Sequence, residues 1–144
     1  MRMSHLFAQT LREAPAEAEA AGYQLLLRAG YIRPVAAGIF ALLPLGQRAM
    51  RRIETLLRQE IEALGGQEIA MPVVQPAQLW KQTGRWQEAA LEMGRFKDHG
   101  ERDLALAMAY EEAVAFLARG EIRSRRQLPA LVYHLQTKWR DDPH

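Results

Sequence analysis

The sequence of 144 residues predicts an α+β fold in which short strands and helices alternate irregularly. Three observations lead to this prediction: one long helical pattern, several short apolar runs that end at or near proline, and one segment with a two-residue alternation. A chain of this length can bury a core of its own. We therefore expect a single domain over residues 1–144.

Residues 45–64 give the clearest helical pattern. Apolar side chains recur there at intervals of three and four residues, and Gly65-Gly66 end the pattern. A second helix is expected over 15–29, with Pro15 at its first position, and a third over 110–119. The apolar stripe of the long helix consists of Leu45, Ala49, Met50, Ile53, Leu56, Leu57, Ile61 and Leu64.

Residues 131–140 give the best strand pattern, because their side chains alternate between two faces. One face carries four polar side chains, which indicates a wet and functional surface. Shorter strands are expected at 38–43, which reads as buried, at 67–71 and at 102–107.

Composition excludes several classes of protein. The chain has no cysteine, so disulfides and thiolate sites are excluded, and its four histidines show no metal-ligand spacing. No signal peptide and no apolar run long enough to span a membrane is present, which predicts a cytoplasmic protein without membrane contact.

The net charge of +2 is too small to indicate a nucleic-acid partner by itself. Four arginines nevertheless fall within eight positions, at Arg119, Arg123, Arg125 and Arg126. They indicate either a solvated face or a contact with an RNA backbone, and the sequence leaves both interpretations open.

Three separated blocks of sequence resemble bacterial prolyl-tRNA synthetases, which are class II aminoacyl-tRNA synthetases. The blocks are LLLRAGYIRPVAAGIFALLPLGQRAMRRIE, GGQEIAMPVVQPAQLWKQTGRW and QLPALVYHLQTKWRD, and the resemblance covers essentially the whole chain. It implies part of a class II core, an antiparallel sheet flanked by helices. Residues 45–72 match the first class motif, a long helix and a strand that ends in proline, and thus imply a homodimer. The apolar stripe of that helix could equally pack on the chain's own core.

The second class motif starts at residues 131–142. Arg140 matches the arginine that grips the ATP α-phosphate, for which a planar fork of donors is well suited. Asp142 stands where the family has a glutamate that meets adenine. An exposed arginine at the end of a strand would look the same in the sequence.

Residues 107–112 match the loop that recognises proline in this family. Glu111 and Glu112 are retained, whereas Ala109 replaces the threonine that, with the first glutamate, holds the substrate's ammonium. Loss of that hydroxyl weakens a site built on hydrogen bonds. The two carboxylates also suit the first turn of a helix whatever the function, so both interpretations remain open.

The resemblance implies ATP-dependent attachment of proline to tRNA, with ATP and Mg²⁺, the ion being bound through the nucleotide phosphates. The sequence shows no third class motif and no anticodon-binding domain, so we expect the isolated chain to be inactive. One alternative is a non-catalytic paralogue that dimerises or docks on a full-length synthetase. Another is a small-molecule or RNA-binding module that uses Arg140 with Lys138, or the arginine cluster, with tRNA as a possible partner.

Overall fold

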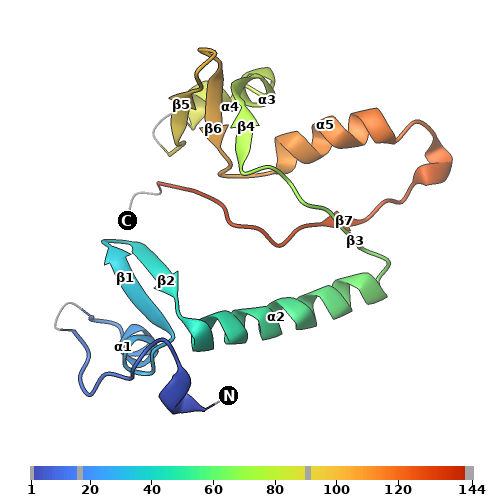
Figure 1. Ribbon diagram of the computed structural model, residues 1–144. Helices are drawn as coiled ribbons and strands as arrows, with labels where there is room; N and C mark the ends of the chain where they lie inside the picture. The colour runs from blue at the N-terminus through green and yellow to red at the C-terminus, as the bar shows by residue number, and fades with distance from the viewer. Residues whose placement is uncertain (1, 16–17, 90–91, 142–144) are drawn as a thin grey trace. The chain divides into compact units, whose positions relative to one another are not determined.

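The computed structural model describes residues 2–15, 18–89 and 92–141, and the chain divides into two compact units, Met1–Glu60 and Ile61–His144. The long helix α2 (Pro44–Ala63) crosses the boundary between them (Figure 1). The single domain expected over 1–144 stays a prediction, because compactness alone does not decide whether two units fold together. Among the described residues no helix is both long enough and apolar enough to cross a bilayer.

The first unit is organised by an antiparallel hairpin of β1 (Ile32–Ala36) and β2 (Ile39–Leu42). Gly38 has a φ of +71° in the turn that joins them, a conformation that glycine adopts without strain. Helix α1 (Ala21–Arg28) precedes the hairpin, and a 3₁₀ turn, η1 (Met3–His5), lies near the N-terminus. Leu27 of α1 is 1% exposed and is the most deeply buried side chain of this unit.

One guanidinium fastens these parts together. Arg33 of β1 donates to the carbonyl of Leu27 at 2.7 Å and to the carbonyl of Gln9 at 2.6 Å. Hydrogen bonds from a charged donor are stronger than neutral ones. The Arg33 side chain therefore links the N-terminal segment and α1 to the hairpin, and a backbone hydrogen bond from Leu11 N to Arg28 O adds a further link between the first two.

Helix α2 confirms the helix expected over 45–64, and its apolar stripe is largely exposed. The one buried residue in the helix, all of which lies in the described part of the chain, is Gly46. The exposed fractions along the stripe are 41% for Met50, 53% for Ile53, 46% for Leu56, 45% for Leu57 and 78% for Leu64.

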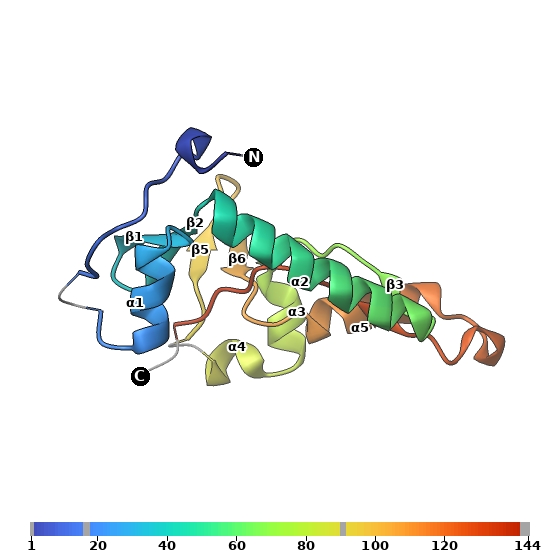
Figure 2. The ribbon, with the colours of Figure 1, turned by 90° about the horizontal axis from the view of Figure 1, so that it is seen from below.

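The second unit contains a three-stranded antiparallel sheet in the order β4 (Val74–Pro76), β6 (Asp103–Leu106), β5 (Arg95–Lys97). Strand β6 is central, as the apolar pattern at 102–107 predicts. Helices α3 (Ala77–Gln82) and α4 (Arg85–Glu88) follow β4, and α5 (Glu111–Glu121) follows β6 (Figure 2). The buried side chains centre on Trp80, Met93, Ala105, Met108 and Ala109, with a second cluster at Met71, Ala107, Tyr110 and Ala113.

The strand predicted over 131–140 is much shorter in the structure. β7 is only Val132–Tyr133, and it pairs in parallel with β3 (Gln67–Glu68). Beyond Tyr133 the chain stays extended, but among the described residues its backbone no longer pairs with the segment that follows β3. Instead the side-chain amide of Gln136 accepts from Met71 N at 2.6 Å and donates to Met71 O at 2.5 Å. Side-chain alternation predicts extended backbone, whereas a strand also needs a backbone partner at each step.

Three smaller expectations need correction. The helix expected over 15–29 begins at Ala21, although it ends near Gly30 as predicted. Gly120 does not end α5, which continues to Glu121. The strand at 38–43 is exposed instead of buried, since Ile39 and Phe40 are 60% and 47% exposed.

Gly46 is predicted to be essential for packing in the first unit. A Cβ at this position would overlap the backbone carbonyl of Tyr31, so Gly46→Ala should destabilise the unit by roughly 1–3 kcal/mol. Gly22→Ala in α1 is the control, because nothing lies within 4 Å of its added methyl group. Urea denaturation followed by circular dichroism measures both changes. Equal stability of the two variants would contradict the close approach.

Candidate functional site

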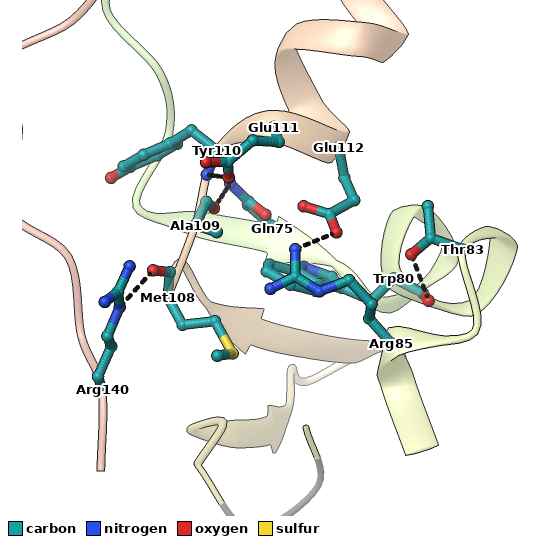
Figure 3. Close-up of polar contacts among 10 residues, drawn as sticks. All are labelled: Gln75, Trp80, Thr83, Arg85, Met108, Ala109, Tyr110, Glu111, Glu112 and Arg140. Atoms are coloured by element: carbon teal, nitrogen blue, oxygen red, sulfur yellow. Dashed lines mark hydrogen bonds and ion pairs between the residues drawn. The ribbon is translucent and has the colours of Figure 1, made fainter. Parts of the chain in front are cut away.

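The turn between β6 and α5 is almost completely buried. Its residues Ala107, Met108, Ala109 and Tyr110 are all at most 6% exposed. The backbone N–H of Ala107 donates to Val73 O at 2.7 Å, and the side-chain amide of Gln75 donates to Ala109 O at 3.3 Å. A turn held in this way presents the start of α5 in one fixed orientation (Figure 3).

Arg140 lies against this turn. Its Nε donates to Met108 O at 3.0 Å, and the neighbouring Trp139 N donates to Ala107 O at 2.9 Å. The residue is exposed, and Figure 3 shows its guanidinium beside the turn. Since only Nε is engaged, among the contacts of the described residues, the two terminal nitrogens can still form a two-pronged contact with an anion.

Glu111 is the first residue of α5 and is exposed. Its carboxylate accepts from the backbone N–H of Tyr110 at 2.9 Å. The hydrogen bond from its own backbone N–H, followed by that from Tyr110 N–H and by the charges of Lys138 and Arg85, holds the pKa of Glu111 below its usual range, against the opposing effect of burial. The side chain is therefore ionised at neutral pH and available to a cation.

Glu112, the next residue, has a different environment. It is 8% exposed, and its Oε1 accepts from the Arg85 guanidinium at 2.6 Å. The same guanidinium lies 5.1 Å from the centre of the fully buried Trp80 ring. The second carboxylate oxygen of Glu112 has no partner among the described residues. Glu112 thus anchors the first turn of α5, whereas Glu111 remains outside.

The side chain of Ala109 packs into the apolar cluster around Trp80 and is 5% exposed. What this residue offers to the turn is its carbonyl, which accepts from Gln75. Asp142, the residue expected near adenine, lies outside the described residues.

An open groove of about 510 Å³ runs beside the site between α5 and the segment 132–134. Glu111 lines it together with Tyr110 and His134, whose rings meet edge to face at 4.7 Å. The Tyr110 hydroxyl donates to Thr137 O at 3.0 Å, and burial raises the pKa of this phenol. Within the described ranges no three His, Asp or Glu side chains gather where they could hold a metal ion.

Sequence reasoning identified Arg140, Glu111, Glu112 and Ala109, and the structure brings all four to one turn. It missed Arg85 and Gln75, because neither residue belongs to a motif or to a strong periodic pattern in the sequence. A helix of four residues, α4, carries Arg85 toward Glu112, 27 positions away. No local pattern could have indicated that pairing.

Solved structures with a similar fold are aminoacyl-tRNA synthetase domains. The RNA binding domain of threonyl-tRNA synthetase from Cryptosporidium parvum aligns with a TM-score of 0.70 at 22% identity, over 75% of this chain and 27% of that one. Prolyl-tRNA synthetase from Giardia lamblia, in complex with prolyl-adenylate, aligns with a TM-score of 0.70 at 24% identity, over 78% and 24% of the two chains. The fold is therefore that of an aminoacyl-tRNA synthetase domain.

Sequence comparison shows which aminoacyl-tRNA synthetases this chain is similar to. A proline–tRNA ligase of Salinispora tropica is 57% identical over 143 residues, which are 99% of this chain and 24% of that protein. Its counterpart in Pelotomaculum thermopropionicum is 50% identical over 142 residues, 99% of this chain and 25% of that protein. No family model matches the chain.

The chain is a homologue of the bacterial prolyl-tRNA synthetases, as the three blocks of sequence predict. It spans about a quarter of the length of the curated relatives it matches.

The Arg85–Glu112 pair is predicted to stabilise the start of α5. Arg85→Ala leaves a buried carboxylate unpaired, which should cost about 2–4 kcal/mol of unfolding free energy. Lys81→Ala is the control: its ion pair with Asp103 is about 40% exposed on both sides, so solvent screens it and its loss should change stability far less. Chemical denaturation compares the two, and similar losses would refute the special role of Arg85.

Proposed function

We propose that this chain forms part of the catalytic core of a class II prolyl-tRNA synthetase in the cytoplasm, where ATP and proline meet before proline is transferred to tRNA. The observation that carries the proposal is the hydrogen bond between Arg140 Nε and Met108 O, which joins residues 32 positions apart. Arg140, which we propose binds phosphate, therefore contacts the turn that leads to Glu111. Homology to proline–tRNA ligases supports the same assignment.

In this proposal Arg140 stabilises the α-phosphate of ATP. Its Nε is fixed by the protein, so the free terminal nitrogens are already oriented and little side-chain freedom is lost on binding. A guanidinium in this position would favour the charge that develops when the proline carboxylate attacks phosphorus. Mg²⁺ would be bound mainly through the nucleotide phosphates.

Glu111 is proposed to hold the ammonium group of proline. Its low pKa keeps the carboxylate charged, and its exposed position on the groove leaves it accessible. The ion pair between Glu112 and Arg85 fixes the first turn of α5, to which Glu111 belongs. Ala109 contributes no hydroxyl, so the ammonium would have one hydrogen-bond acceptor fewer than in the family pattern.

The exposed apolar stripe of α2 supports a homodimer. Side chains such as Ile53 and Leu57 are about half exposed along a helix of 20 residues. Contiguous exposed apolar surface commonly marks a protein–protein interface. Residues 45–72, the proposed first class motif, include this stripe.

A second candidate is a non-catalytic paralogue that docks on a full-length synthetase. The apolar surroundings of Ala109 favour it, because this position no longer offers a polar group to a substrate. Both candidates use the α2 stripe, and they differ in whether ATP and proline are bound.

Nucleotide binding tests the role of Arg140. Titration calorimetry with Mg–ATP should give a binding signal that Arg140→Ala weakens by at least roughly tenfold, as expected when a charged hydrogen bond is lost. Arg102→Ala is the matched control, because Arg102 is an exposed arginine of the same unit that pairs with Asp98. Unchanged affinity in Arg140→Ala would contradict the assignment.

Proline-dependent exchange of pyrophosphate into ATP tests activity in the same samples. The 144-residue chain spans a quarter of its relatives' length, so we expect no turnover above a blank when it is assayed alone. Turnover well above the blank would refute its inactivity and exclude the paralogue.

The dimer is tested by charge insertion into the α2 stripe. Leu57→Asp should shift the chain to a monomer in sedimentation velocity at tens of micromolar, because a carboxylate cannot enter an apolar interface without a partner. Gln59→Asp is the control, since Gln59 is exposed and lies outside the stripe. A wild-type chain that sediments as a monomer would remove the support for this interface.

A further inference from the structure

The end of α5 and the chain that follows it concentrate positive charge. Residues 119–127, here called the basic loop although they include the last three residues of α5, contain four arginines and one glutamate, whereas the whole chain has a net charge of only +2. The remainder of the chain is therefore slightly negative. In Figure 1 the loop lies at the end of α5 that points away from the β4–β6–β5 sheet of the same unit.

The basic loop is built by its own hydrogen bonds. The Gln127 side-chain oxygen accepts from Arg123 N at 2.8 Å and from Ser124 N at 2.9 Å, and its Nε2 donates to Glu121 O at 3.0 Å. Ser124 caps the 3₁₀ turn η2 (Arg125–Gln127) by accepting from Arg126 N. The arginines thus project from a fixed backbone, so less conformational entropy is lost when they bind a partner.

The arginines of this loop are exposed and lack acidic partners. No ion pair in the described part of the chain involves Arg119, Arg123, Arg125 or Arg126, and the Arg123 side chain donates from Nε to Gly120 O at 3.2 Å. An exposed arginine elsewhere in this unit, Arg102, is paired with an aspartate.

Arg119 lies in the last turn of α5, where the negative end of the helix dipole favours a positive charge. This preference does not explain three further arginines beyond the last turn. The dipole effect falls off within one turn of the helix end.

An exposed aromatic ring adjoins this charge. Phe116 is 61% exposed and, with Leu117 and Arg119, lines a shallow groove of about 320 Å³ at the end of α5. An arginine without an acidic partner among the described residues, here Arg119, next to an exposed aromatic ring suits RNA, since phosphates pair with arginine and unstacked bases stack on aromatic rings.

We propose that the basic loop binds the phosphate backbone of a structured RNA, with Phe116 stacking on an unpaired base next to the duplex. Bidentate contacts between guanidinium and phosphate give the affinity. Within the proposed function the natural RNA would be a tRNA, but the contact needs neither ATP nor proline. It uses none of the residues of the 107–112 turn, so the two proposals can fail separately.

The test measures fluorescence anisotropy of a labelled RNA hairpin with a short unpaired 3′ end, titrated with the chain between 50 and 200 mM KCl. Three or four phosphate contacts predict a slope of about −3 in log affinity against log salt, hence roughly 100-fold weaker binding across this range. The double variant Arg125→Ala/Arg126→Ala should reduce the slope by about 2 and weaken binding at the lowest salt roughly tenfold or more.

The matched control is Arg51→Ala/Arg52→Ala on α2, which removes the same charge from adjacent exposed arginines. It should leave the slope unchanged. Equal losses in both double variants would overturn the proposal, because they would reveal attraction to overall charge. Absence of any salt-dependent binding by the wild-type chain would also overturn it.

A second pair of variants tests the aromatic contact. Phe116→Ala should weaken binding of the hairpin with an unpaired end roughly tenfold and leave a blunt duplex unaffected, whereas Leu117→Ala should change neither.

Poly-glutamate should compete only weakly with the labelled hairpin for the wild-type chain. Competition as strong as that of the unlabelled hairpin would instead identify an acidic protein as the partner and overturn the assignment to RNA. Circular dichroism of each variant verifies that the fold is retained.

Discussion

Three hydrogen bonds between the extended segment 136–140 and the buried turn at 107–110 hold the candidate site together. One joins backbone atoms of Trp139 and Ala107, the second joins the Arg140 side chain to Met108 O, and the third runs from the Tyr110 hydroxyl to Thr137 O. Because the turn is almost fully buried, its carbonyls need partners, and the incoming segment supplies them. The same requirement that satisfies the backbone also brings the Arg140 side chain to the turn that precedes Glu111.

Glu111 and Glu112 are neighbours in the sequence, but the difference in their burial suits one to binding and the other to a structural role. Glu112 is withdrawn from water and tied to Arg85, whose other face covers Trp80. Glu111 stays exposed and is held ionised by backbone N–H groups at the start of α5. The Arg85–Glu112 pair fixes the orientation of the first turn of α5. Moving Arg85 away would leave the buried Glu112 charge without a partner, which is costly. The exposed residue keeps its charge for a ligand.

Two exposed surfaces, the apolar stripe of α2 and the basic loop, differ in chemistry. The stripe of α2 is apolar and exposed over much of its length, and association would remove that surface from water. The basic loop is charged and internally rigid, and its arginines lack acidic partners among the described residues. Its natural complement is a regularly charged polymer. The first surface therefore suits a protein partner and the second suits RNA.

The sequence by itself determined the long helix α2, the central strand β6 and the start of α5 within a residue, because periodicity, proline and glycine act locally. It also determined homology to prolyl-tRNA synthetases, and through it the candidates Arg140, Glu111, Glu112 and Ala109. The tertiary structure decided which glutamate is buried, that Arg85 is its partner, and that 131–140 is mostly extended chain with only two residues of strand. These outcomes depend on groups far apart in the sequence. Hydrogen-bond partners and local dielectric are set by what packs nearby, which no pattern within one segment contains.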